Sequence, residues 1–237
     1  MALSPAQRSQ LRKRAAKEAA ASAPAHSMAG ATTYELQLLQ LAQDRARLKQ
    51  IQSEQGKAEL KRQLLPAYAP YVEGVLSAGQ GAQDEVLTTL MVWCMDAGDY
   101  RSALGIAEYV LRHGLLMPDR FARTTGCLVA EEVANAALKA QKAGGTFDLA
   151  VLERTQELTA AQDMPDEARA KLLLATGRAT LDGEAPGLPR LLIGIDLLKR
   201  AIDLHSSCGG KKDLERAERL LKNIAAPEAP EASAAAD

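Results

Sequence analysis

Positive charge is concentrated at the amino end of the chain. Five cations fall within positions 8–17 and are followed by the single acid Glu18. They are Arg8, Arg12, Lys13, Arg14 and Lys17. Side chains of this type bind nucleic-acid phosphates, because each neutralised phosphate releases condensed counterions whatever the base sequence. We predict that these five side chains contact phosphates. The alternative is a terminus that is only solvated, and the charge pattern alone does not separate the two interpretations.

Few apolar residues accompany these charges. Leucine occurs only at positions 3 and 11 of the first 31 residues. A helix formed here would have good propensity but no apolar face with which to dock. The stretch Ser22-Ala-Pro-Ala-His26 then has the composition of a linker. We therefore expect residues 1–31 to form a flexible basic arm that becomes ordered when it binds.

A second basic stretch lies on the helix predicted after the arm. Its cations are Arg45, Arg47, Lys49, Lys57, Lys61 and Arg62, and its acids are Asp44, Glu54 and Glu59. Several of the cations are three or four residues apart, which places them on one side of a helix. We predict phosphate contacts from Lys61 and Arg62, and a solvated mixed-charge face is the alternative.

Two short segments combine acids with lysine, as metal-dependent nucleases do. They are Glu59-Leu-Lys61 and Pro165-Asp-Glu-Ala-Arg-Ala-Lys171. In a nuclease, carboxylates hold Mg²⁺ and the lysine stabilises the scissile phosphate. Such sites normally stand on adjacent strands, whereas both segments here have helical patterns, in which acids stabilise the helix dipole or form surface pairs. We therefore assign no catalytic residue, metal ligand or cofactor, and Mg²⁺ is expected only if the chain is a nuclease.

The other residues capable of chemistry form no site by spacing. The three histidines and three cysteines lie far apart, in no metal-binding or disulfide arrangement. Gly209-Gly210-Lys211-Lys212 lacks the full spacing of a phosphate-binding loop and predicts a helical turn. No Walker motif is present, so we expect no ATPase activity.

Composition predicts an all-α protein. Only 3% of residues are aromatic, whereas Ala, Leu, Glu, Lys, Arg and Gln, which favour helices, dominate. The net charge of −1 gives no overall attraction to nucleic acid, so any attraction must come from how charge is distributed. No apolar run approaches the ~20 residues of a membrane-spanning helix, and the cysteine usage fits a reducing cytosol. We expect no membrane partner.

Breaks in helical periodicity divide the chain into five segments. The basic arm at 1–31 precedes a long helix at 32–65, a helical core at 66–183, a helix pair at 184–225 and an acidic tail at 226–237. The long helix is a candidate for oligomerisation or DNA binding, and prolines at 66 and 70 open the core. Like the basic arm, the tail is expected to be flexible.

Within the helical core, residues 82–97 carry the broadest apolar stripe and should be buried, Trp93 included. Gly98-Asp99 turns the chain and predicts an antiparallel helical hairpin. Further core helices are predicted near 129–143, 147–161 and 165–181. The stripes of the C-terminal helix pair and an apolar seam over 34–51 are subunit or partner surfaces or, equally, internal core.

Six short motifs follow one another along the chain. They are Ser4-Pro-Ala-Gln-Arg8, Gly81-Ala-Gln-Asp-Glu85, Asp96-Ala-Gly-Asp99, Gly114-Leu-Leu-Met-Pro118, Glu131-Glu-Val-Ala134 and Asp163-Met-Pro-Asp-Glu167, which runs into Arg169-Ala-Lys-Leu172. In these motifs and their spacing, from about residue 4 to about residue 177, the chain resembles the gpM-type small terminase subunits of tailed temperate phages.

The resemblance implies a subunit that binds viral double-stranded DNA at the cohesive-end packaging site, assembles as a homo-oligomeric ring and delivers DNA to a large ATPase subunit in the host cytoplasm. Members of this family are designated endonuclease subunits, so cleavage of concatemeric DNA at cohesive ends is the first alternative. A non-catalytic helical adaptor is the second. Related subunits can carry basic tails, whereas this tail is acidic, which puts a DNA role for the C-terminus in doubt.

Overall fold

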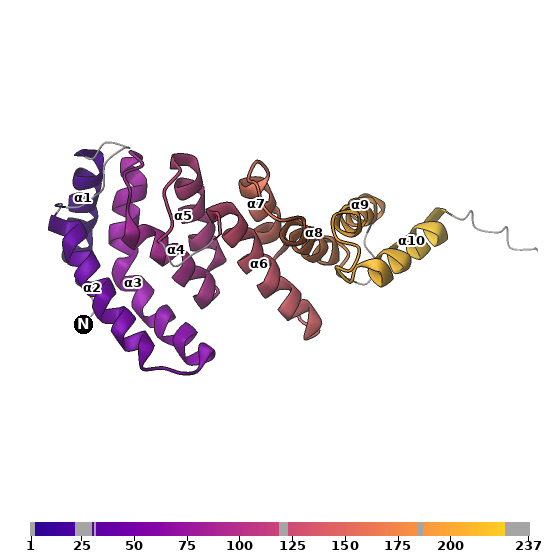
Figure 1. Ribbon diagram of the computed structural model, residues 1–237, viewed down its shortest axis with the longest axis horizontal. Helices are drawn as coiled ribbons and strands as arrows, with labels where there is room; N and C mark the ends of the chain where they lie inside the picture. The colour runs from indigo at the N-terminus through magenta and orange to yellow at the C-terminus, as the bar shows by residue number, and fades with distance from the viewer. Residues whose placement is uncertain (1–2, 22–29, 31, 119–122, 184–186, 226–237) are drawn as a thin grey trace, which may run out of the picture. The chain divides into compact units, whose positions relative to one another are not determined.

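The computed structural model describes residues 3–21, 30, 32–118, 123–183 and 187–225, which are mostly helical (Figure 1). Their helices are α1 (Pro5–Ala21), α2 (Thr32–Lys49), α3 (Glu54–Ala78), α4 (Glu85–Ala97), α5 (Tyr100–His113), α6 (Thr125–Lys142), α7 (Leu149–Thr159), α8 (Asp166–Thr180), α9 (Leu188–Leu204) and α10 (Lys211–Ala225). These ranges contain no β-strand, which confirms the all-α prediction. Among the described helices, none combines the length and apolar character of a membrane span.

The chain forms two compact units. The first comprises Met1–Val133 and Arg154–Met164, and the second comprises Ala134–Glu153 and Pro165–Asp237. The helical core predicted over 66–183 is therefore divided between the units, and the predicted C-terminal helix pair shares a unit with α8. Periodicity shows which face of a helix is buried but not which neighbour covers it, so this division is not visible in the sequence.

Helix α4 is the most deeply buried helix of the first unit. Val86, Leu87 and Leu90 are fully buried, and Trp93 is 6% exposed. The predicted burial of residues 82–97 is thus confirmed. This core supports the helices on either side, α3 and α5.

The ends of α4 and α5 are fixed by their caps. The Asp84 side chain accepts a hydrogen bond from the backbone N–H of Leu87 at 2.8 Å and starts α4. Gly98 ends that helix in the left-handed region at φ 82°, and Asp99 caps α5 by accepting from the Ser102 N–H at 3.1 Å. The predicted hairpin at Gly98-Asp99 is confirmed, because α4 and α5 pack together.

The prediction of one long helix over 32–65 is wrong, because α2 and α3 are separate helices. Ser53 stands between them and accepts the Gly56 N–H at 3.0 Å, so a strong N-cap starts a new helix. Pro66 and Pro70 lie inside α3 and do not open a new segment. Since they are four residues apart, the backbone bonds that they remove lie on one side of the helix, which continues past them.

The apolar seam predicted over 34–51 belongs to the interior of the first unit. Tyr34, Leu41 and Leu48 are each less than 9% exposed. The core interpretation of this seam is therefore the correct one, and it leaves no apolar stripe of α2 built from these residues for a second subunit.

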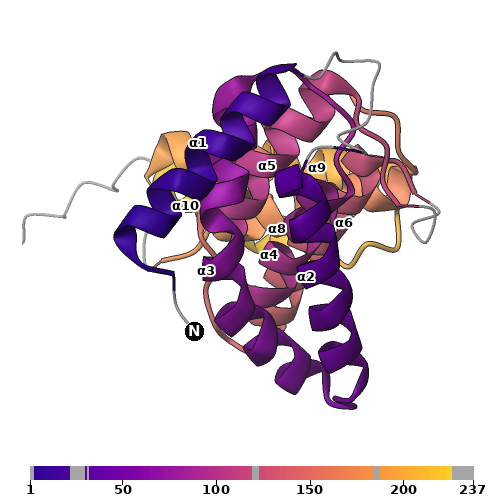
Figure 2. The same cartoon turned by 90° about the vertical axis from the view of Figure 1, so that its left-hand side faces the viewer.

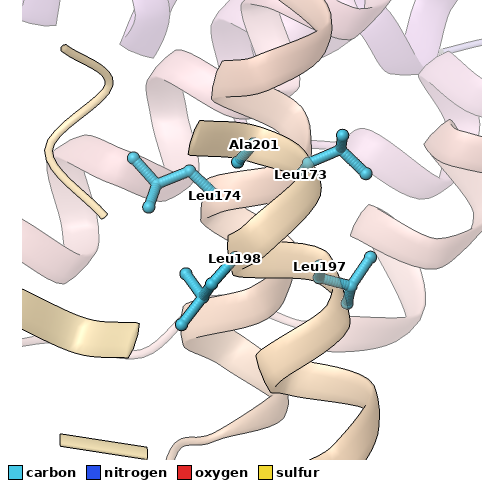
Figure 3. Close-up of a cluster of buried hydrophobic side chains, with 5 residues drawn as sticks. All are labelled: Leu173, Leu174, Leu197, Leu198 and Ala201. Carbon is cyan, nitrogen blue, oxygen red and sulfur yellow. The ribbon is translucent and has the colours of Figure 1, made fainter. Parts of the chain in front are cut away.

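Helices α8 and α9 form the centre of the second unit. The buried side chains between them, labelled in Figure 3, are Leu173, Leu174, Leu197, Leu198 and Ala201. Gly194 of α9 permits close approach, because an added Cβ would lie 2.5 Å from Leu181 Cγ. Leu191 and Ile195 of α9 are buried against Ala217 of α10. The α9 stripe is thus internal core as well.

Candidate nucleic-acid interface

Helix α1 is docked on α3, which corrects the prediction that this segment lacks a docking face (Figures 1 and 2). Ala15 and Ala19, one turn apart, are 0% and 1% exposed. At Gly74 of α3, an added Cβ would lie 2.5 Å from the Arg12 carbonyl oxygen and 2.7 Å from Ala15 Cβ. Small residues let the two backbones approach, so no stripe of large apolar residues is needed.

A carboxylate fastens the end of α1 to the start of α2. Glu18 accepts hydrogen bonds from the Thr33 backbone N–H at 2.9 Å and from the Thr33 hydroxyl at 2.7 Å. The only acid of the basic segment is therefore used inside the first unit. Its charge is directed at the amino end of α2, where the helix dipole favours an anion.

The five predicted cations of α1 are all exposed, but they divide into two groups. With 3.6 residues per turn, Lys13, Arg14 and Lys17 project from the side of α1 away from Ala15 and Ala19. None of these three cations forms an ion pair with another described residue. We call them the outward cations. By helical geometry they lie within about one turn, on one side of a helix that is held in place.

Arg8 and Arg12 lie on the same stripe of α1 as the buried alanines. Arg12 Nη1 is 3.8 Å from Glu73 Oε2 of α3, with both side chains about half exposed. Together with Pro5 and Pro70, these residues line a groove of about 280 Å³ between α1 and α3. Glu73 partly neutralises this end of the helix, so Arg8 and Arg12 are weaker candidates for phosphate contact than the outward cations.

Lys61 and Arg62 of α3 already have partners in the first unit. Lys61 pairs with Asp96 and is 14% exposed at its side chain. Arg62 pairs with Glu59, and its Nε donates to the Ala97 carbonyl oxygen at 3.1 Å. These contacts hold α3 against the end of α4. The predicted DNA contact of Lys61 and Arg62 stays a prediction. To bind phosphate, these two side chains would have to give up their present partners.

A buried carboxylate supports α3, on which α1 rests. Asp84 is fully buried and accepts a hydrogen bond from the Tyr71 hydroxyl at 2.6 Å. Burial raises the pKa of Asp84 to about 6, although the bonds from Tyr71 and the Leu87 N–H act in the opposite direction. Burial and the nearby Asp84 carboxylate also raise the pKa of Tyr71, so the phenol keeps its proton and remains the donor.

The two acid and lysine segments are helical, and a glutamate of each pairs with a cation on its own helix. Glu59 pairs with Arg62, and Lys171 Nζ lies 2.8 Å from Glu167 Oε1 on the same helix. Asp166 and Glu167 occupy the first turn of α8, immediately after Pro165. Among the described residues, no group of three or more His, Cys, Asp or Glu side chains is placed to hold a metal ion.

Two features of this interface are not predicted from the sequence. The docking of α1 depends on Ala15 and Ala19, and their four-residue spacing is the signal that small-residue packing leaves. The partner Gly74 is far away in sequence. Nothing local marks it as a contact, because a glycine inside a helix by itself indicates only a less stable helix. The Glu18 to Thr33 contact likewise depends on tertiary placement.

Comparisons with known proteins give matches that cover most of the chain. Residues 38–167 match the family model described as phage small terminase subunit. The chain is similar to the terminase, endonuclease subunit of Escherichia phage P2, with 46% identity over 220 residues, covering 92% of this chain and 86% of the relative. It is also similar to the probable terminase, endonuclease subunit of Haemophilus phage HP1, with 26% identity over 179 residues, covering 71% of this chain and 63% of the relative. No solved structure matches.

Proposed function

The chain belongs to the phage small terminase subunit family, and we propose that it binds viral double-stranded DNA through the outward cations of α1 and delivers this DNA to a large terminase subunit for packaging. The family supports the role in packaging and implies DNA and a large subunit as partners. The surface that contacts the DNA is our own assignment.

One observation carries this assignment: Lys13, Arg14 and Lys17 face solvent on a helix whose single acid is turned to Thr33. A docked helix holds cations in fixed positions, so less ordering entropy is lost on binding than for a flexible arm. Contacts of this kind fix the position of the protein on the duplex without reading bases. Sequence recognition at the packaging site would need further residues.

The test replaces Lys13, Arg14 and Lys17 together by glutamine. Duplex binding at low salt should weaken by at least tenfold, because contacts to phosphate dominate non-specific affinity. The matched control replaces Arg101, Lys139 and Lys142 by glutamine; these are exposed cations of α5 and α6 that form no ion pair with another described residue. Equal loss in both variants would show a general charge effect and would refute the assignment to α1.

Cleavage of DNA at cohesive ends is the second candidate, because both relatives are named as endonuclease subunits. Incubation of the purified chain with a cohesive-end duplex and Mg²⁺, without the large subunit, tests this activity. Nicking that a chelator abolishes would support an enzyme. Intact DNA under conditions where the chain binds the duplex would support a subunit that binds without cutting.

We also propose that the chain works as a homo-oligomeric ring in the host cytoplasm. A ring would repeat the outward cations around its circumference, so weak contacts in each copy would add up to firm binding. Native mass spectrometry of the full chain, with and without duplex DNA, tests this proposal. A single species with the mass of one chain at micromolar concentration would contradict it.

A further inference from the structure

Helix α10 of the second unit has a strongly segregated surface. Its apolar residues gather on one side, where Leu214, Ala217 and Leu221 meet the α8 and α9 side chains of the core. The polar side carries five cations and one acid within an arc of about 140° by helical geometry. The cations are Lys211, Lys212, Arg216, Arg219 and Lys222, and the acid is Glu215. We call this surface the α10 basic face.

The other acids of α10 are directed toward neighbouring helices. Asp213 lies 2.8 Å from Arg178 Nε of α8, with side chains 20% and 29% exposed. Glu218 lies 2.9 Å from Lys199 Nζ of α9. Folding thus neutralises two of the three acids of α10 with cations from other helices. The sequence of α10 has mixed charge, whereas its solvent-facing side is predominantly positive.

Most cations of the α10 basic face are not paired with an acid of the described residues. Lys211, Lys212, Arg219 and Lys222 form no ion pair with any other described residue. Arg216 is 3.5 Å from Asp213, which Arg178 already neutralises. A helix that directs this many unpaired cations to solvent has a surface that fits a polyanion.

We propose that the α10 basic face is a second surface for the phosphates of duplex DNA. From Lys211 to Lys222 its cations extend over about 16 Å, at 1.5 Å per residue, which is a linear array suited to a nucleic-acid backbone. Its sequence contains no aromatic residue on which an unpaired base would stack, so it fits a duplex better than a single strand. The inference extends the proposed function, since DNA is the ligand of both surfaces.

The second surface changes how the C-terminal part of the chain is understood. The acidic tail predicted over 226–237 argued against a DNA role for this end, but the charge of α10 has the opposite sign. The region matched by the family model ends at residue 167, so the α10 basic face lies beyond it. Each unit would then carry one basic helix that binds DNA phosphates.

The test uses the double variant Lys212→Gln and Arg219→Gln in the full chain. These positions are seven residues apart, two turns along one side of α10. With a 30-base-pair duplex of random sequence, the slope of log K against log salt should become shallower by about 1.8, from about 0.9 per phosphate contact. The matched control is Lys139→Gln and Lys142→Gln on α6 of the same unit, where the slope should stay unchanged.

A substitution of opposite sign keeps the test valid if the double variant folds poorly. Glu215→Lys removes the one acid of the α10 basic face and adds a cation, so affinity for the same duplex should rise several-fold and the salt slope should steepen. Unchanged binding in a folded Glu215→Lys variant would overturn the proposal. Far-UV circular dichroism of each variant reports whether the helices remain.

The outcomes separate this proposal from the proposed function. If the α1 triple variant loses affinity and the α10 double variant does not, the α10 assignment is wrong and the α1 assignment stands. If only the α10 double variant loses affinity, the α1 assignment is wrong and the α10 assignment stands. If neither variant loses affinity, both assignments are refuted. If the α10 variant binds DNA normally but loses affinity for polyglutamate, the face is a site for acidic protein segments, which also overturns the proposal.

Discussion

The two basic helices reach a similar surface by different routes. Helix α1 has one acid, Glu18, and attaches through small residues at Ala15 and Gly74. Helix α10 has three acids and attaches through an amphipathic stripe and the Arg178 to Asp213 pair. The comparison shows that the charge a helix presents to solvent depends on where its acids point after folding. A count of charges along the sequence therefore underestimates how positive the solvent-facing side of α10 is.

The largest effect is expected where α1 is attached. Gly74→Ala places a Cβ within 2.5 Å of a backbone oxygen that cannot move independently, so the free energy of unfolding of the first unit should fall by about 3 kcal/mol, near the upper end of usual overpacking costs. Amide hydrogen exchange should accelerate along α1 and remain unchanged along α10. Faster exchange in α10 as well would contradict the separate attachment of the two helices.

A glycine in α5 gives the matched control. Gly105 also lies inside a helix, but nothing stands within 4 Å of an added Cβ. Gly105→Ala should therefore raise the free energy of unfolding by roughly 0.5–1 kcal/mol, since alanine is the better helix former. A loss in both variants would mean that the Gly74 result reflects helix chemistry and not the contact with α1.

The next effect is a dependence of the first unit on pH. The pKa of Asp84 is raised from 3.8 to about 6 by burial, so the folded state binds more protons between these values. The free energy of unfolding should therefore be highest below pH 4 for this group and fall by roughly 2–3 kcal/mol as the pH rises through 6. Denaturant titrations from pH 4 to 7 measure it.

Asp84→Asn provides the comparison for this pH effect. Asparagine is also a good N-cap and does not ionise, so the variant should lose this part of the pH dependence while keeping α4 capped. A variant with the same slope as the wild type would mean that another group titrates. Asp84 belongs to the first unit and α10 to the second, so amide hydrogen exchange along α10 should not follow this pH profile.

Removal of the Tyr71 hydroxyl should have a somewhat smaller effect. Tyr71→Phe leaves the buried Asp84 carboxylate without its side-chain donor, and a hydrogen bond to a charged group contributes about 2 kcal/mol. The loss should be greater at pH 7 than at pH 4.5, because the ionised carboxylate needs the donor more. Thermal unfolding at the two pH values measures the difference, and equal losses would contradict the role of Tyr71.

The smallest predicted effect concerns α10. Arg178→Gln leaves Asp213 with only the more exposed Arg216 as partner, so the stability of the second unit should fall by about 1 kcal/mol, as expected for a partly exposed pair. Duplex affinity should fall about twofold, because an uncompensated acid then lies beside the α10 basic face. Exchange along α1 should not change. Tighter DNA binding would contradict the account of charge segregation.

Much of the fold follows from the sequence, whereas the placement of charges does not. Periodicity and caps identify α4 to α10 within a few residues, because apolar stripes and residues such as Asp99 act locally. They fail at Ser53 and Pro66, where a single hydroxyl starts a helix and a proline is tolerated inside one. They also fail at Gly74, Glu18 and Asp213, whose partners are distant in sequence and become visible only after folding.

The concentration of cations at 8–17 and the family resemblance together make this segment a DNA-binding candidate, but the sequence does not rank its five cations. Docking separates Lys13, Arg14 and Lys17, which face solvent, from Arg12, which lies near Glu73. The ranking depends on which side of α1 is buried. That side is marked by alanines, which have too little apolar surface for a periodicity analysis to detect.

The most direct measurement of the central claim is the salt dependence of duplex binding by the wild type and by the Lys13, Arg14 and Lys17 triple glutamine variant. If all three outward cations contact phosphates, the slope of log K against log salt should become shallower by about 2.7, at roughly 0.9 per contact. Parallel lines for the two proteins would show that these cations touch no DNA, and the account of α1 would be wrong.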